Sequence, residues 1–354
     1  MQSPGLWGSQ QYQYAPAPPP KKGGALKWVL GGTALIAVIA ITAVVTMSLG
    51  GGDKDKGDGS GPTATAGSGS SSEFASANDT GPVTIITEDP SCAAWIPILN
   101  TLADTEKNGW ADRDPAIPAS AWNPSQRAQY EAVGQAMRNA ADQTVSLAKI
   151  TTHRVMRELY EQFIAYARAY ADAIPTYTPA NDELARTASS ATAVLADVCQ
   201  AIKLGSAPAR APMVQEGPAP TNVAPIDSPT NPERFLPNRL PACDDWKAAV
   251  DMYTENTTAW ARTDPNIPAG QWSPEQKALN DAVIPVMRNA ADQFEQIGRD
   301  SQNSTFEDFA ALAAQYRRAY TEAIPTYSTA DHRLYSASLK ASGTIIAACA
   351  AAGA

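Results

Sequence analysis

The second half of this chain repeats the first at a spacing of about 150 residues, and this duplication limits its possible folds more than any other feature. Three motifs recur. They are WADRDPAIPASAWNPSQ at 110–126 and WARTDPNIPAGQWSPEQ at 260–276, MRNAADQ at 137–143 and 287–293, and AIPTY at 173–177 and 323–327. A repeat of this length is a whole domain and not a unit of a short-period solenoid. The sequence therefore predicts two copies of one fold.

Each copy has the sequence pattern of four helices. In the first copy we expect them at about 91–108, 123–149, 155–173 and 179–199, with equivalents in the second copy from 242 onward. The second helix should begin at Asn123 and Pro124, because Asn caps helices well and Pro fits the first helical position. The third should stop before Pro175, since a residue that precedes Pro avoids the helical conformation.

The four cysteines fit a bundle in which the helices alternate in direction. Four such helices return the chain to its starting end, so the start of the first helix lies near the end of the fourth. Each copy has one cysteine at each of these places. An even number of cysteines in an oxidising compartment indicates disulfides. The sequence therefore predicts the pairs Cys92–Cys199 and Cys243–Cys349.

An uncharged apolar stretch at 28–49 is long enough to cross a bilayer as a helix. Lys21, Lys22 and Lys27 precede it, and the positive-inside rule then keeps the N-terminus in the cytoplasm. A cleaved signal peptide is the alternative, but its apolar region is usually shorter and no suitable cleavage site follows. We expect a disordered cytoplasmic tail at 1–27, a membrane helix at 28–49 and a cell-membrane location with the bulk of the chain outside the cytoplasm.

The remaining segments complete the predicted organisation. A Gly- and Ser-rich flexible linker should cover 50–87, and a Pro-rich linker 203–241. The two helical repeat domains then span 88–202 and 242–354. The predicted fold class is all-α: two tandem four-helix up-and-down bundles of about 110 residues, each closed by one disulfide, after a single transmembrane helix. The linker between the domains should let each fold independently.

The connection between the first two helices is the main candidate for a binding site. It is about 13 residues long, has no expected secondary structure and keeps its length in both copies. Its aromatic and acidic residues are Trp110, Asp114 and Trp122, and Trp260, Asp264 and Trp272 in the second copy. They could form an aromatic pocket for a sugar ring or a cationic group. Alternatively, the indole rings fasten the loop to the bundle, and the AIPTY turn should pack against the same loop.

The charged residues of MRNAADQ suggest a structural role. Arg138 and Asp142 are four residues apart on one helix, as are Arg288 and Asp292, so each pair can bridge along the helix surface. The alternative is a buried polar cluster in which Asn139 and Asp142 meet Tyr170 or Arg168.

Nothing in the sequence indicates a cofactor or a metal site. The only two histidines, His153 and His332, do not align between the copies, and no cysteines are spaced as a metal-binding pair. An envelope hydrolase with paired carboxylates would have to use Asp114 and Asp142, or Asp264 and Asp292. The formal net charge of −9 argues against nucleic acid as a partner.

The order of a Pro-rich tail, one apolar span, a Gly/Ser linker and exported domains resembles the proline-rich single-pass envelope proteins of actinobacteria. This resemblance concerns the layout and brings no functional residues with it. We therefore expect a non-catalytic, membrane-anchored binding or scaffold protein of the cell envelope. Its partner would be another envelope protein or a cell-wall glycan, and the carboxylate hydrolase is the alternative.

Overall fold

The computed structural model describes residues 73–226 and 228–353, and within these ranges it contains helices and no strands. The helices are α2 (Cys92–Glu106), α3 (Pro124–Ile150), α4 (Arg154–Ala173), α5 (Asp182–Lys203), α6 (Ser206–Arg210), α7 (Ala242–Asn256), α8 (Pro274–Asp300), α9 (Ser304–Ala323) and α10 (His332–Ala352). Short 3-10 helices lie in the connections: η1 (Ala119–Ala121), η2 (Ile174–Thr176), η3 (Pro179–Asn181), η4 (Ala211–Met213), η5 (Trp260–Arg262), η6 (Ala269–Gln271), η7 (Ile324–Thr326) and η8 (Thr329–Asp331). The all-α prediction is confirmed for this part of the chain.

The prediction of a membrane anchor needs correction. Within the described ranges no helix is both long enough and apolar enough to cross a membrane. The longest helices, α3 and α8, have 27 residues each but carry charged residues along their length, which a bilayer core does not accommodate. The predicted tail at 1–27 and membrane helix at 28–49 lie outside the described residues. The structure therefore does not support the predicted anchor, cytoplasmic N-terminus or membrane location.

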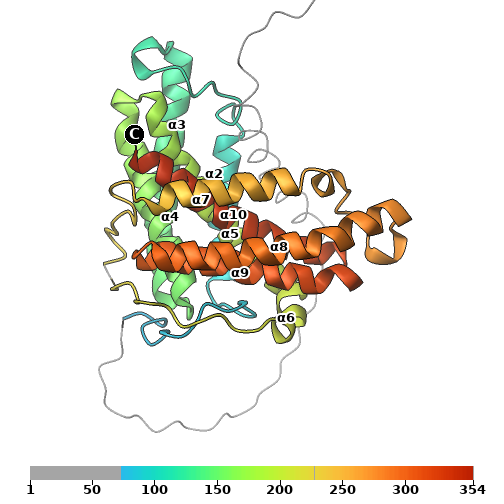
Figure 1. Ribbon diagram of the computed structural model, residues 1–354. Coiled ribbons are helices and arrows are strands. Elements are labelled where there is room, and N and C mark those ends of the chain that lie inside the picture. Colours follow the sequence, from blue (N-terminus) through green and yellow to red (C-terminus); the bar gives the residue numbers. More distant parts are fainter. Residues whose placement is uncertain (1–72, 227, 354) are drawn as a thin grey trace, which may run out of the picture. The chain divides into compact units, whose positions relative to one another are not determined.

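Each repeat is a bundle of four consecutive helices. α3 packs against α2 and α4, and α5 packs against α4 and returns to α2. The second repeat has the same contacts among α7, α8, α9 and α10, and Figure 1 shows α8 and α9 side by side. Disulfides join Cys92 to Cys199 and Cys243 to Cys349, as the sequence predicts. The chain path in each repeat is thus the expected one.

Local sequence signals place the helix ends. The Asn123 side chain accepts a hydrogen bond from the Gln126 amide, while the Gln126 side chain accepts one from the Asn123 amide, which forms a complete capping box. α4 gives way to η2 just before Pro175, as predicted. At the end of α5, Gly205 takes a left-handed conformation with φ of 79°, a conformation that suits glycine after a helix.

The two repeats pack against each other instead of standing apart. α5 and α10 form the most extensive helix contact among the described residues. Their small side chains, such as Ala191 and Ala341, are fully buried, and a Cβ on Gly343 would lie 4.0 Å from the Ser190 hydroxyl. One cluster of buried apolar residues extends through both repeats. A linker between independent domains implies few contacts between them, and this is wrong here, because α5 and α10 bury residues on nearly every face.

The Pro-rich segment contributes to this packing. Phe235 is buried with its ring edge-on to Tyr166 of α4 and to Phe309 of α9, at centroid distances of 6.3 and 5.4 Å. Its amide donates to the Gln162 side chain, and its carbonyl accepts from the Asn303 side chain at 2.8 Å. This part of the segment therefore sits between the two repeats.

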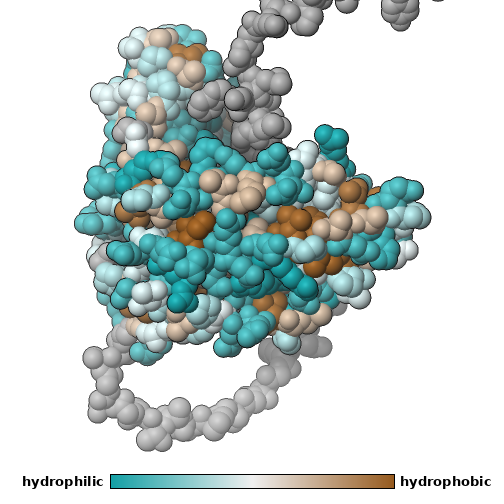
Figure 2. Space-filling model, viewed as in Figure 1, coloured by the Kyte–Doolittle hydropathy of each residue, from teal (hydrophilic) through white to brown (hydrophobic). Residues whose placement is uncertain are grey.

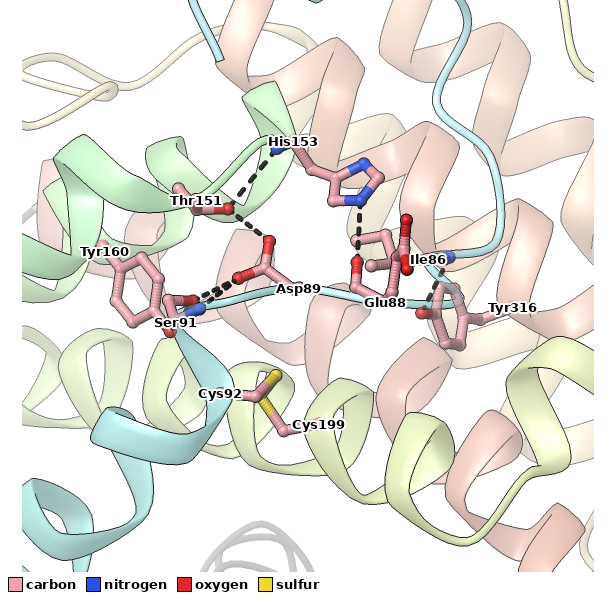
Figure 3. The surroundings of a disulfide bond; sticks show 10 residues. All are labelled: Ile86, Glu88, Asp89, Ser91, Cys92, Thr151, His153, Tyr160, Cys199 and Tyr316. Carbon is pink, nitrogen blue, oxygen red and sulfur yellow. Dashed lines mark hydrogen bonds between the residues drawn. A yellow bond between two sulfur atoms is a disulfide. The ribbon is translucent and has the colours of Figure 1, made fainter. Parts of the chain in front are cut away.

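The stretch that precedes α2 is also fixed to both repeats. Figure 3 shows the Asp89 carboxylate accepting hydrogen bonds from the Ser91 amide at 2.8 Å and from the Thr151 hydroxyl at 2.5 Å, beside the first disulfide. The Ile86 amide donates to the hydroxyl of Tyr316 in α9 at 3.3 Å. The Ala75 amide donates to the Lys149 carbonyl of α3 at 2.8 Å. The stretch 73–87, which the sequence assigns to a flexible linker, thus forms contacts with α3 and α9.

Candidate binding site

In both repeats the loop that precedes α3 or α8 packs on the AIPTY turn. The Ala119 amide donates to the Tyr177 carbonyl at 2.9 Å, and the Tyr177 hydroxyl donates to the Pro115 carbonyl at 2.9 Å. The second repeat has the same two bonds, with Tyr327 in the place of Tyr177. The predicted contact between loop and turn is therefore confirmed.

The two candidate acids have a local structural role. Asp114 is exposed, and its carboxylate accepts a hydrogen bond from the Ala116 amide at 2.9 Å. Asp264 is also exposed and accepts from the Asn266 amide at 2.8 Å and from the Asn266 side chain at 2.9 Å. A carboxylate that bonds the backbone two residues later shapes a turn. Asp264 in addition lies at the edge of a cavity described below.

The first repeat is filled by its own side chains at this end. The Arg113 guanidinium lies 3.4 Å from the centre of the buried Trp110 ring and forms an ion pair with Asp182. The Trp110 indole N–H donates to the Tyr170 hydroxyl at 3.2 Å. A cation on an indole face with a carboxylate partner is a stable internal arrangement. Trp110 therefore serves the fold of the first repeat.

Trp122 also has a structural role. Its ring is 8% exposed and stacks on Tyr130 at a centroid distance of 3.9 Å, and its indole N–H donates to the Ile117 carbonyl at 2.9 Å. The Tyr130 ring lies 5.1 Å from that of Tyr177. For the first repeat the structure thus favours the alternative in which indole rings fasten the loop to the bundle.

The second repeat is open at the same end. A cavity of about 140 Å³ lies between the loop, the turn and the helices. It is lined by Trp260, Ala261, Thr263, Asp264, Pro265, Trp272, Gln276, Asn280, Tyr320, Tyr327, His332 and Tyr335. All three residues predicted for the second copy therefore line one cavity. In the first copy, Arg113 covers the Trp110 ring and Tyr130 stacks on Trp122.

Replaced side chains explain the difference. The equivalent positions, first repeat and then second, are Tyr130 and Asn280, Arg113 and Thr263, Asp182 and His332, and Ala185 and Tyr335. The large side chains of Tyr130 and Arg113 are thus replaced by shorter ones in the second repeat. The side-chain oxygen Oδ1 of Asn280 accepts from the Trp260 indole N–H at 2.8 Å, so the Asn280 side chain fixes the indole without filling the space. Tyr335 fills part of it and lies edge-on to Trp260 at 4.9 Å.

His332 changes the charge of the cavity wall. Burial is the main cause that lowers the pKa of His332 to about 4, and the charge of the neighbouring Arg333 guanidinium acts in the same direction. The imidazole is therefore neutral at pH 7, where the first repeat has the Asp182 carboxylate. The sequence interpretation missed His332 because it considered only residues that both copies share.

The charged residues of MRNAADQ connect two helices. Arg138 pairs with Asp172 at 2.7 Å, and Asp142 pairs with Arg168 at 2.6 Å, in each case between α3 and α4. In the second repeat the pairs are Arg288 with Glu322 and Arg318 with Asp292. The predicted bridges along one helix are therefore wrong, and the predicted contact of Asp142 with Arg168 exists at the surface. Such exposed pairs contribute little to stability.

The arrangement does not support a carboxylate pair for hydrolysis. Asp142 lies 18 residues along α3 from Pro124, which is roughly 27 Å along the axis at the usual helical rise. Asp114 lies in the loop that precedes this helix, and its carboxylate bonds the backbone there. Paired carboxylates of glycosidases lie about 5–9 Å apart. Among the described residues there is also no group of three His, Cys, Asp or Glu that could hold a metal ion.

The comparisons with known proteins identify a family. Residues 74–353 match the family model described as "Mycobacterial ESX-1 associated protein". An uncharacterised protein of Mycolicibacterium smegmatis (strain MKD8) is 51% identical over 342 residues, which cover 97% of this chain and 90% of that protein. No solved structure matches. The match is not to a proline-rich envelope family, which the layout resembles. Because the family model covers both repeats, this chain belongs to the family of mycobacterial ESX-1 associated proteins.

Proposed function

We propose that this protein is a non-catalytic binding protein that acts in ESX-1 secretion and holds a partner protein at the cavity of its second repeat. Its membership of the ESX-1 associated family supports the process. The observation that supports the binding role is the open aromatic cavity, at a place where the first repeat is closed.

The cavity wall is fixed before any partner arrives. The Trp272 indole N–H donates to the Ile267 carbonyl at 2.8 Å, and the Tyr327 hydroxyl donates to the Pro265 carbonyl at 2.6 Å. The Trp260 indole is held by Asn280. Their polar atoms thus point to the protein itself, and the rings contribute apolar surface to the cavity. A preformed site loses little conformational entropy when it binds.

A protein partner suits this lining better than a glycan. Sugar recognition needs several free hydrogen-bonding groups, because unpaired hydroxyls are costly in a closed site. Here both polar atoms of the Asn280 amide are used within the protein, by Trp260 and by the Gln276 carbonyl. The Gln276 side chain donates to the Asp264 carbonyl. The walls therefore offer mainly ring surface, which suits an apolar or aromatic side chain.

The exposed surface gives a second reason to place recognition at the cavity. Figure 2 shows a face on which hydrophilic residues predominate and hydrophobic ones form small separate patches. The exposed large apolar residues among the described ones are scattered over several elements, including Ile150, Leu204, Met213 and Met252. Scattered apolar residues of this kind do not mark an interface. The open aromatic cavity of the second repeat is the more specific feature.

Gene deletion in a mycobacterium with an active ESX-1 system tests this function. We expect the deletion to lower the amount of ESX-1 substrates in the culture filtrate, and the wild-type gene to restore it. The Trp272→Ala variant should restore less, while Met252→Ala, at an exposed site on α7, should restore fully. Unchanged secretion in the deletion strain would contradict the proposal.

A further inference from the structure

The first repeat shows what fits the end of the bundle. The ring of Tyr130 is 2% exposed and lies 3.9 Å from the Trp122 ring and 5.1 Å from the Tyr177 ring. The Trp122 stack is nearly parallel, with an interplanar angle of 29°. Stacked and tilted ring pairs at these distances are favourable contacts. The end of the first repeat therefore accommodates a phenol ring, and this ring is the side chain of Tyr130 itself.

The second repeat keeps the walls of this site and lacks its occupant. Trp272 and Tyr327 face each other at 5.8 Å and 25°, close to the 5.3 Å and 32° of Trp122 and Tyr177. Asn280 stands at the position of Tyr130. Trp272 is only partly buried, whereas Trp122 is covered by the Tyr130 ring. The cavity of about 140 Å³ thus contains the place from which a phenol ring is missing.

A guanidinium group, the other occupant in the first repeat, fits this cavity less well. Tyr335 lies edge-on to the Trp260 ring, at the indole whose counterpart is covered by Arg113. The carboxylate that pairs with Arg113 is replaced by His332. The carboxylate that lines the cavity, Asp264, is exposed at its edge and accepts hydrogen bonds from Asn266. A cation at the Trp260 ring would therefore lack the close buried partner that Arg113 has in Asp182, and a buried charge without such a partner is strongly unfavourable. Lysine and arginine side chains of a partner are therefore poor candidates.

We infer that the cavity of the second repeat receives an aromatic side chain of the partner protein, stacked on Trp272 in the manner of Tyr130 on Trp122. The involvement of a partner rests on the proposed function, whereas the preference for an aromatic ring rests on the two repeats alone. The first repeat does not share this activity, because Tyr130 and Arg113 occupy its equivalent space.

Binding of p-cresol, the tyrosine side chain as a free molecule, tests the inference on the full chain by ligand-observed NMR. We expect saturable binding of p-cresol and at least tenfold weaker binding of 4-methylcyclohexanol, which has a similar size but no aromatic ring. Asn280→Tyr should fill the cavity from within and weaken p-cresol binding at least tenfold. Ala278→Tyr, which adds the same ring at an exposed position of α8, should bind p-cresol like the wild type.

Several results would overturn the inference. These are a wild-type protein that does not bind p-cresol, equal binding of the two compounds, or a folded Asn280→Tyr variant with unchanged binding. If Asn280→Tyr does not fold, Trp272→Ala replaces it and should also weaken binding at least tenfold, and unchanged binding would again be decisive. The secretion assay is separate: lost secretion without p-cresol binding would refute this inference and leave the proposed function standing.

Discussion

Arg154 of the first repeat and Asp308 of the second form a buried two-point ion pair. The Nε and Nη2 atoms of Arg154 lie 2.7 and 2.9 Å from the two carboxylate oxygens, and the side chains are 2% and 1% exposed. The Nη1 and Nη2 atoms also donate to the carbonyls of Asp79 and Gly81. One guanidinium therefore connects both repeats with the segment that precedes α2.

Removal of this guanidinium should destabilise the whole unit. Arg154→Met leaves the Asp308 carboxylate buried without its partner, and breaking a buried pair in this way costs about 3–5 kcal/mol. Arg138→Met is the matched control, because it breaks the exposed pair with Asp172 and should cost at most about 1 kcal/mol. Urea unfolding measures both values. Similar losses of unfolding free energy in the two variants would show that the buried pair contributes no more to stability than an exposed pair.

The two repeats should unfold together. Their shared apolar cluster, the contact of α5 with α10 and the Arg154–Asp308 pair all cross the boundary between the domains predicted at 88–202 and 242–354. We expect one transition in differential scanning calorimetry of the full chain. Arg154→Met should lower the temperature of this transition without splitting it into two. Two separate transitions would instead support the independent folding predicted from the linker.

The equivalent tryptophans should differ in their contribution to stability. Trp122→Ala removes a buried ring from the Tyr130 stack, and such truncations cost about 3–5 kcal/mol, or about 6 °C or more in the melting midpoint. Trp272→Ala removes a partly buried ring that borders a cavity, so we expect less than half of this shift. Circular dichroism melting gives both midpoints. Equal shifts would contradict the difference between a closed and an open repeat.

Stability should also depend on pH through Glu106. Burial raises the pKa of this carboxyl from 4.5 to about 7, against the opposing effect of the Arg113 guanidinium. Because the folded state then holds a proton that the unfolded state releases, stability should fall as pH rises from 4.5 to 7, by roughly 3 kcal/mol. Burial also raises the pKa of Glu158, Glu183 and Asp197, so Glu106→Gln should make the fall smaller by the Glu106 share. Glu131→Gln, at an exposed position of α3, should leave the fall unchanged. Urea unfolding at pH 5 and pH 8 measures the difference.

The features that depend on residues close together in the sequence, or on the direction of the chain, could be predicted. Asn123 and Pro124 place the start of α3, Pro175 ends α4, and the alternating helices bring Cys92 to Cys199. Each of these depends on local backbone preference or on chain direction. The loop and turn could be paired for the same reason, since an up-and-down bundle puts both at one end.

The contact between the repeats could not be predicted in the same way. α5 and α10 meet through small residues such as Ala191 and Ala341, and such residues do not show in the sequence which helix they face. Arg154 aligns with Ser304 and Asp308 with Glu158, so the duplication keeps an acid at one position but not the arginine that pairs with it. The cavity did leave a signal, in the change from Tyr130 to Asn280. The sequence interpretation used only residues that both copies share. These residues form the bundle and its loop, whereas the cavity depends on positions at which the copies differ.

The Tyr130 and Asn280 pair has a consequence for the history of the chain. Tyrosine and asparagine codons differ by a single base, and the same holds for suitable codons of arginine and threonine, and of aspartate and histidine. The fourth replacement, Ala185 and Tyr335, needs at least two base changes, so about five changes separate the closed end of the bundle from the open one. The step between the two states therefore needs new side chains at four positions and leaves the helices and their connections as they are.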